Sequence, residues 1–93
     1  MNKNDLRELF EHARIGNFKY IALEIQQDGV HDNEVIIIHQ NNFERKWEYI
    51  DNAYDKDLHL KNAPFIWIID ASYGESFKEL ESDLMPNMGI EVL

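Results

Sequence analysis

The sequence predicts an α+β domain with a small three-stranded sheet and three helices, in the order α-β-β-α-β-α. Three segments carry apolar residues at helical spacing, and three others carry alternating or β-branched apolar runs. Composition agrees, because 44% of the 93 residues are hydrophobic while the chain has only 4 Gly, 2 Pro and no Cys. We therefore expect residues 1–93 to form a single domain that is held together by packing without disulfides.

The first predicted element is a helix that Asp5 caps and Gly16 ends. Its apolar residues recur on one face: Leu6, Leu9, Phe10 and Ala13. Apolar and polar side chains then alternate from Phe18 to Gln26, which is typical of a strand with one wetter face. Turn residues follow, and a second strand over residues 34–40 completes a hairpin.

A second helix is predicted after Asn41 and Asn42, which are good capping residues. Its apolar positions again have helical spacing: Phe43, Trp47, Ile50, Tyr54 and Leu58. Pro64 precedes a third strand over residues 65–71, which is rich in β-branched and aromatic residues. The turn at residues 73–75 separates this strand from the last part of the chain.

The last predicted helix begins at Ser76, which forms a capping box with Glu79, and stops at Pro86. Residues 90–93 either form a short edge strand or dock on the domain. The connection between the second and third strands contains a helix, so a right-handed crossover would make those strands parallel neighbours. An antiparallel sheet with the third strand beside the first is the alternative.

We place the second strand at the centre of the sheet, because residues 35–38 are apolar on both faces. If all three helices covered one face, the other would expose an apolar patch for a partner or a second copy to bury. If the helices divided between the faces, the domain could be monomeric.

The net charge of −9 disfavours direct binding to nucleic acid, because a polyanion would meet a repulsive field. No apolar run approaches the roughly 20 residues that span a bilayer, and the first residues lack the pattern of a secretory signal. We therefore expect a cytoplasmic protein without a membrane segment.

Enzyme motifs are missing from the sequence. None of the three serines lies in a nucleophile elbow, and the four glycines are scattered singly, so no loop cradles a phosphate. A metal-dependent hydrolase using Glu8, His12 and His39 is an alternative hypothesis, but their spacing matches no metal signature. Glu8 and His12 also have the spacing of a solvated i, i+4 pair. We expect no enzyme activity, no catalytic residue, no metal and no cofactor.

The acidic surplus is densest near the end of the chain, where residues 70–93 hold six acids and one base. We interpret this region as a surface that docks on a basic protein, while the competing interpretation is a solubilising face. The candidate partner-binding residues are acidic side chains with two aromatic contacts: Asp70, Glu75, Glu79, Glu81, Asp83, Tyr73 and Tyr49.

The chain also resembles small uncharacterised proteins encoded by phages, prophages and mobile elements of Gram-positive bacteria. The resemblance covers roughly residues 6–84, and these matching segments carry it: Asn42-Phe43, Lys46, Tyr49, Ala53-Tyr54, Asp57–Leu60, Ile66, Ile68, Tyr73–Phe77 and Leu80-Glu81. It implies a genomic setting in which small acidic proteins often bind host factors. It implies no reaction and no catalytic residue.

These observations predict a non-enzymatic, phage-type accessory protein that binds a protein partner with a basic surface. In its most specific form the hypothesis is DNA mimicry, in which the acidic surface inhibits a nucleic-acid-handling host protein by replacing its polyanionic ligand. The alternative hypothesis is a self-associating structural domain that forms a homodimer through its sheet face.

Overall fold

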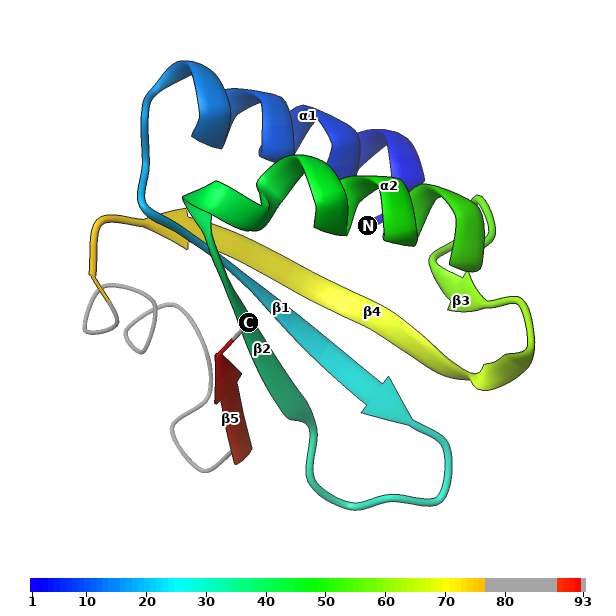
Figure 1. Cartoon of the computed structure of the whole chain (residues 1–93). Helices are drawn as coiled ribbons and strands as arrows, with labels where there is room; N and C mark the ends of the chain where they lie inside the picture. Colours follow the sequence, from blue (N-terminus) through cyan, green and yellow to red (C-terminus); the bar gives the residue numbers. More distant parts are fainter. Residues whose placement is uncertain (77–88, 93) are drawn as a thin grey trace.

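The computed structural model describes residues 1–76 and 89–92, and it has two layers, with two α-helices packed on one face of a sheet (Figure 1). The helices are α1 (Lys3–Ile15) and α2 (Phe43–Ala53), and the short 3-10 helix η1 (Gln40–Asn42) leads into α2. The strands are β1 (Tyr20–Gln27), β2 (Glu34–His39), β3 (His59–Leu60), β4 (Ala63–Gly74) and β5 (Gly89–Val92). The α+β class is therefore confirmed.

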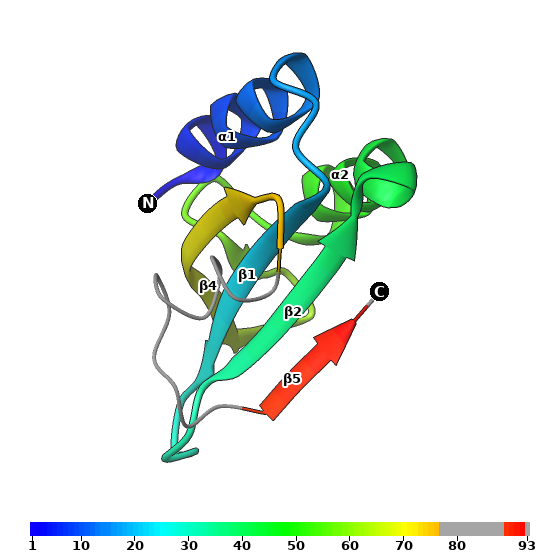
Figure 2. The same cartoon turned by 90° about the vertical axis from the view of Figure 1, so that its left-hand side faces the viewer.

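The numbers of elements differ from the prediction. The described residues form two α-helices and five strands, with sheet order β3-β4-β1-β2-β5, rather than three helices and three strands. Each neighbouring pair among β3, β4, β1 and β2 is antiparallel, and β5 pairs parallel to β2 at the edge seen in Figure 2. Of the two alternatives left open for the end of the chain, the edge strand is confirmed as β5. The helix expected from Ser76 to Pro86 falls almost entirely on residues 77–88, outside the described residues.

Helix α1 begins earlier than predicted, because its N-cap is Asn2 rather than Asp5. The Asp5 backbone N–H donates to Asn2 Oδ1, and the Asn2 backbone N–H donates to Asp5 Oδ2, both at 2.9 Å. This reciprocal capping box places Asp5 at the third helical position, where its charge also favours the helix dipole. At the other end, Gly16 lets the Phe18 ring approach closely, since a Cβ there would lie 2.6 Å from a ring carbon.

Helix α2 ends at Ala53, so the prediction that it continues to Leu58 is wrong. Tyr54 is already extended, with φ −109° and ψ 147°, and Leu58 has a left-handed φ of 64°. Asp55 causes this change, because its Oδ1 accepts the backbone N–H groups of Asp57 and His59, both at 2.9 Å. The side-chain turn competes with the helix, and Leu58 reaches the core from a loop instead.

The turn after α2 should contribute stability that depends on pH. The hydrogen bond from His59, assisted by that from Asp57, lowers the pKa of Asp55 below its ordinary value of 3.8. A carboxyl with a lowered pKa stabilises the fold above that ordinary value and loses its contribution as the pH falls through the lower folded-state pKa. We expect Asp55→Asn, which removes the charge but keeps an oxygen acceptor, to be less stable than the wild type at neutral pH.

That difference in stability should shrink as the pH drops below about 4. Urea unfolding at a series of pH values measures it, and Asp57→Asn, whose side chain does not accept these bonds, serves as the matched control. A gap between wild type and Asp55→Asn that stayed constant into strong acid would contradict the assignment.

The strand order corrects the expectation that the second and third strands are parallel neighbours. β4 runs in the same direction as β2, as a helical crossover requires, but β1 lies between them and pairs antiparallel with both. The antiparallel alternative, with the third strand beside the first, is therefore confirmed. β1 rather than β2 occupies the centre, because the crossover passes over β1 before the β3–β4 hairpin returns the chain to the sheet.

The main core lies between the helices and the sheet. Leu6 and Phe10 of α1 and Ile50 of α2 pack there against Ile21 of β1 and Ile68 of β4. β1 and β4 change register between Glu24 and Ile25, which leaves Ile69 as the extra residue of a bulge. Because of the bulge, Asp70 pairs with Glu24. Beyond it, the side chains of β4 again alternate between the two faces of the sheet in register with those of β1.

The opposite face of the sheet has a second, smaller cluster formed by Ala22, Val35 and Ile37. Both described helices lie on the other face; the predicted apolar patch required all three helices there, and the third predicted helix lies outside the described residues. These three side chains are nevertheless at most 3% exposed. They therefore offer no apolar patch to a second copy. Neither α1 nor α2 is long and apolar enough to cross a membrane.

Candidate functional site

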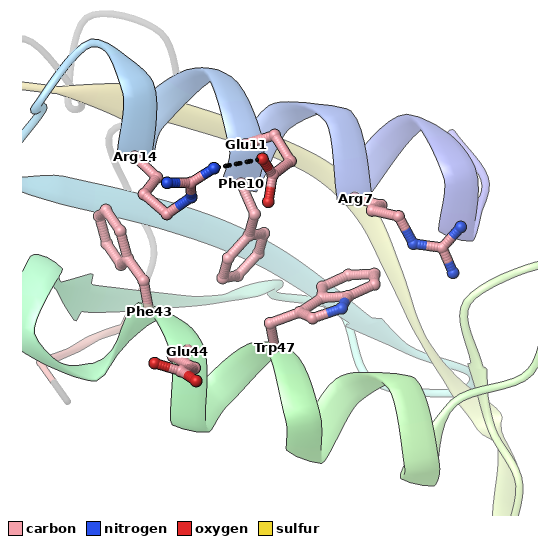
Figure 3. Close-up of a pocket in the computed structure, with 7 residues that line it drawn as sticks. All are labelled: Arg7, Phe10, Glu11, Arg14, Phe43, Glu44 and Trp47. Atoms are coloured by element: carbon pink, nitrogen blue, oxygen red, sulfur yellow. Dashed lines mark hydrogen bonds and ion pairs between the residues drawn. The ribbon is translucent and has the colours of Figure 1, made fainter.

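A groove with a volume of about 360 Å³ lies between α1 and α2 in the described part of the chain and is shown in Figure 3. The two helices run in opposite directions, so the end of α1 lies beside the start of α2 (Figure 1). The groove is lined by aromatic and charged side chains: Arg7, Phe10, Glu11, Arg14, Phe43, Glu44 and Trp47. Its volume lies within the range of ordinary ligand pockets.

Three aromatic rings form the floor of the groove. Phe10 and Phe43 are buried and meet edge to face with ring centroids 6.0 Å apart, and the Trp47 ring lies 5.3 Å from that of Phe10. Such tilted contacts hold the rings in place. Phe10 and Phe43 also belong to the main core, so the floor is part of the rigid interior. Trp47 is only partly buried and presents indole surface to the groove.

Charged side chains form the rim, and two of them neutralise each other. Arg14 Nη2 donates to Glu11 Oε2 at 2.7 Å, and both side chains are more than half exposed. This contact lowers the pKa of Glu11 and raises that of Arg14. The pair is solvated, so it contributes little to stability, but it orients the Arg14 guanidinium along the rim.

Arg7 is held more loosely at the other end of the groove. Its guanidinium carbon lies 5.6 Å from the centre of the Trp47 ring, and Nη1 donates to Asn4 Oδ1 at 3.1 Å. The nearest carboxylate contact is Asp51 Oδ1 at 3.9 Å, which is longer than a hydrogen bond. Asp51 is shared with Lys3, whose Nζ lies 3.6 Å from the same oxygen. Arg7 therefore retains donors for an anionic group.

A second hollow of about 330 Å³ adjoins the first and shares Arg14, Phe43 and Glu44 with it. It lies where the turn after α1 meets η1, and amide side chains line it: Asn17, Gln40 and Asn41. Asn17 adopts a left-handed φ of 56°, which Asn tolerates better than most residues. The two hollows adjoin at the three residues that they share; the first is aromatic towards Trp47, and the second is rich in amides towards Asn41.

The charges on the sheet are distributed differently from those on the helices. Residues 20–39 and 63–76, which form β1, β2, their loop and β4, hold six carboxylates and no Lys or Arg, whereas α1 has three of each sign. Glu24 is buried and accepts Asn33 Nδ2 at 3.2 Å. The other five are exposed and form what we call the acidic strand layer: Asp28, Asp32, Glu34, Asp70 and Glu75.

Aromatic side chains accompany Asp70 on the face of the sheet opposite the helices. The Trp67 ring stacks on His59 of β3, with centroids 5.3 Å apart and planes 18° apart. The His59 ring Nδ1 is hydrogen-bonded to the Pro64 carbonyl oxygen at 2.6 Å, which fixes the stack. Phe65 lies two residues before Trp67 and therefore on the same face, and it is 49% exposed.

The predicted partner-binding residues do not form one surface within the described part of the chain. Asp70 is exposed on the face opposite the helices, and Glu75 is exposed beyond the end of β4. Tyr73 points to the helix side and packs against Phe18, with ring centroids 4.6 Å apart. Tyr49 is 52% exposed on α2, where Lys46 Nζ lies 5.5 Å from its ring centre. Glu79, Glu81 and Asp83 lie outside the described residues.

The residues of the hydrolase hypothesis are not brought together as metal ligands. Across residues 1–76 and 89–92, no three His, Cys, Asp or Glu side chains form a group that could hold a metal ion. Glu8 and His12 are exposed on α1. His39 has a structural role, since its Nδ1 accepts the Asn41 backbone N–H at 3.2 Å and so caps η1.

Comparison with other proteins supplies no site to transfer to these residues. No family model, curated protein or solved structure matches the chain. The candidate surfaces are therefore defined by the contacts of the described residues alone. These surfaces are the groove between the helices and the acidic strand layer with its aromatic neighbours.

Sequence reasoning missed the groove. Phe10, Phe43 and Trp47 were each expected on a helix face that packs on the core, and Phe10 and Phe43 are indeed buried. The usable signal was Arg7, Glu11 and Arg14, which recur at i, i+4 and i+7 and so share one face of α1. That spacing shows that the three lie together, but it gives no sign that α2 lies opposite them.

Proposed function

We propose that this chain is a non-enzymatic, phage-type protein-binding module whose acidic strand layer docks on a basic surface of a partner protein. The observation that carries the proposal is the separation of charge between the layers. The strands contribute carboxylates without any Lys or Arg, while the bases of α1 are matched by acids on the same helix. Carboxylates that no base in the same strands balances attract a complementary partner over distances of about 8–10 Å at physiological salt.

The aromatic residues beside Asp70 would supply binding energy that the carboxylates alone do not provide. Exposed carboxylates speed association and select the partner, but buried aromatic anchors usually supply most of the binding energy. Phe65 and Trp67 share the face of Asp70, and the His59 stack holds Trp67 in one orientation. A basic surface with apolar lysine or arginine stems would contact both kinds of group.

Charge reversal at matched positions tests the proposal. The strand variant carries Asp32→Lys and Asp70→Lys, and the helix variant carries Glu8→Lys and Glu48→Lys, so both have the same net charge. We expect the strand variant to lose about tenfold of its binding to proteins captured from a host lysate, and the helix variant to keep it. Quantitative mass spectrometry of the captured proteins measures the difference, and unchanged thermal melting shows that each variant folds.

Two further readouts address the partner. Binding should weaken as salt rises from 50 to about 500 mM, because screening shortens the range of the attraction. In the DNA-mimicry form of the proposal, duplex DNA should displace the captured protein. If both variants lost binding equally, net charge alone would explain the binding, which would contradict a role for the acidic strand layer. A complex that is insensitive to salt would also contradict the proposal.

Self-association through the sheet face is a weaker candidate. It needs a wide exposed apolar area, and because Ala22, Val35 and Ile37 are buried, the exposed apolar side chains described on this face are Phe65 and, in part, Trp67. Sedimentation equilibrium of the same preparations separates the two functions, because the docking proposal does not require a mass that rises with concentration.

A further inference from the structure

We infer that the groove between α1 and α2 binds an extended peptide segment of a protein partner, one that carries a large apolar side chain next to a carboxylate. This site lies between the two helices, apart from the acidic strand layer (Figure 3). We expect it to bind an acidic segment, whereas the acidic strand layer would bind a basic surface. The inference therefore goes beyond the proposed docking function. Shape, polarity and charge each contribute to it.

The shape favours a chain over a compact molecule. Two hollows of about 360 and 330 Å³ adjoin along the helices and share three of their lining residues. The first has an aromatic floor and can accept a large side chain. The second presents Asn17, Gln40 and Asn41, whose amides offer both donors and acceptors to a peptide backbone. An extended segment could place its anchor in the first hollow and its main chain in the second.

Among the charges of the rim, Arg7 is the one that favours an acidic group in the partner. Glu11 is compensated by Arg14 at 2.7 Å, so this pair adds little net field. Arg7 lies at the Trp47 end with its nearest carboxylate oxygen 3.9 Å away, and it presents the planar guanidinium that suits a bidentate carboxylate. Glu44, by contrast, repels an anion from the rim shared by the two hollows. A carboxylate is therefore expected beside Arg7, with the apolar anchor against Trp47.

The chain contains a built-in reporter for this site. It has two tryptophans, of which Trp47 lines the groove and Trp67 lies on the opposite face of the sheet. Trp67→Phe leaves Trp47 as the only indole. Binding in the groove should then change the fluorescence of this variant saturably, while contacts on the acidic strand layer should leave it unchanged.

A randomised heptapeptide pool displayed on yeast provides the probe without requiring a known sequence. The full chain with Trp67→Phe is the bait, and clones that bind an Arg7→Glu version equally well are discarded. We expect the remaining clones to share an aromatic or large aliphatic residue adjacent to Asp or Glu. Synthetic peptides of these clones should quench or shift Trp47 fluorescence, and replacing their acid by Lys should abolish the effect.

Matched variants give the decisive comparison. Arg7→Gln should weaken peptide binding about tenfold, because it removes one charge-assisted contact. Glu44→Gln should strengthen it severalfold, and Arg45→Gln, which removes a charge from α2 outside the groove, should change it less than twofold. Selection of basic peptides, an absence of clones that distinguish Arg7→Glu, or equal losses in Arg7→Gln and Arg45→Gln would each overturn the inference. So would binding of phenylacetate as tight as that of the peptides.

Discussion

Ile68→Ala is expected to lower the free energy of unfolding by about 3 kcal/mol, whereas Ile69→Ala should lower it by less than about 1 kcal/mol. The two residues are neighbours in β4 and have the same side chain. Ile68 is 2% exposed and packs between the helices and the sheet. Ile69 is the extra residue of the bulge and is only partly buried. Removing the same atoms therefore leaves a cavity at one position and not at the other.

Urea unfolding followed by circular dichroism measures both values, provided that the slopes of the transitions agree. The comparison tests the register as well as the packing, because a shift of one residue exchanges the faces of the two side chains. Equal destabilisation, or a larger effect at Ile69, would show that the bulge is misplaced.

Leu58 should reverse the usual order of alanine and glycine substitutions. Its side chain is fully buried, so truncation is expected to cost about 3–4 kcal/mol. Its backbone, however, has a φ of 64°, where residues with a Cβ are strained by about 1–2 kcal/mol and glycine is not. We expect Leu58→Gly to be more stable than Leu58→Ala by about 1 kcal/mol.

Leu6 provides the control for this reversal, because it is equally buried but lies in the regular part of α1. There the glycine variant should be the less stable one by about 1 kcal/mol. Thermal or urea unfolding of the four variants gives both differences. The same order of alanine and glycine at the two positions would contradict the left-handed conformation of Leu58.

The two proposed surfaces differ in the partner that each would recognise. The acidic strand layer suits a basic folded surface, and the groove suits a short acidic segment with an apolar anchor. Because they lie on different layers of the fold, substitutions in one should leave the other intact. The variants Asp70→Lys and Arg7→Gln therefore separate the functions, and a chain that uses both surfaces could join two partners.

Local patterns predicted most of the elements that depend on neighbouring residues. The spacing of Leu6, Phe10 and Ala13 identified the buried face of α1, and all three are in the core. The hairpin of β1 and β2 followed from alternation and turn residues. Errors arose where one local pattern fits two structures. Tyr54 and Leu58 continue the helical spacing of α2, but Asp55 forms a turn there and the helix ends before them.

The candidate surfaces were harder to predict than the elements. Asp70 and Tyr73 are close in sequence and were assigned to one surface, but the pleat of β4 sends them to opposite faces. The groove was missed because its aromatic residues look like core residues from either helix alone. Trp47 satisfies that pattern while still presenting one side to the hollow that Arg7 and Arg14 border.

From its residues alone, this chain already specifies an acidic α+β domain with a defined amphipathic first helix and a β-hairpin, because these depend on contacts within a few positions. Only the tertiary structure decided that β1 is central, that β4 runs beside it, and that two helices enclose an aromatic groove. Those outcomes depend on which distant segments meet. The pairing of apolar faces is a property of the whole packed arrangement, and several pairings satisfy the same local pattern.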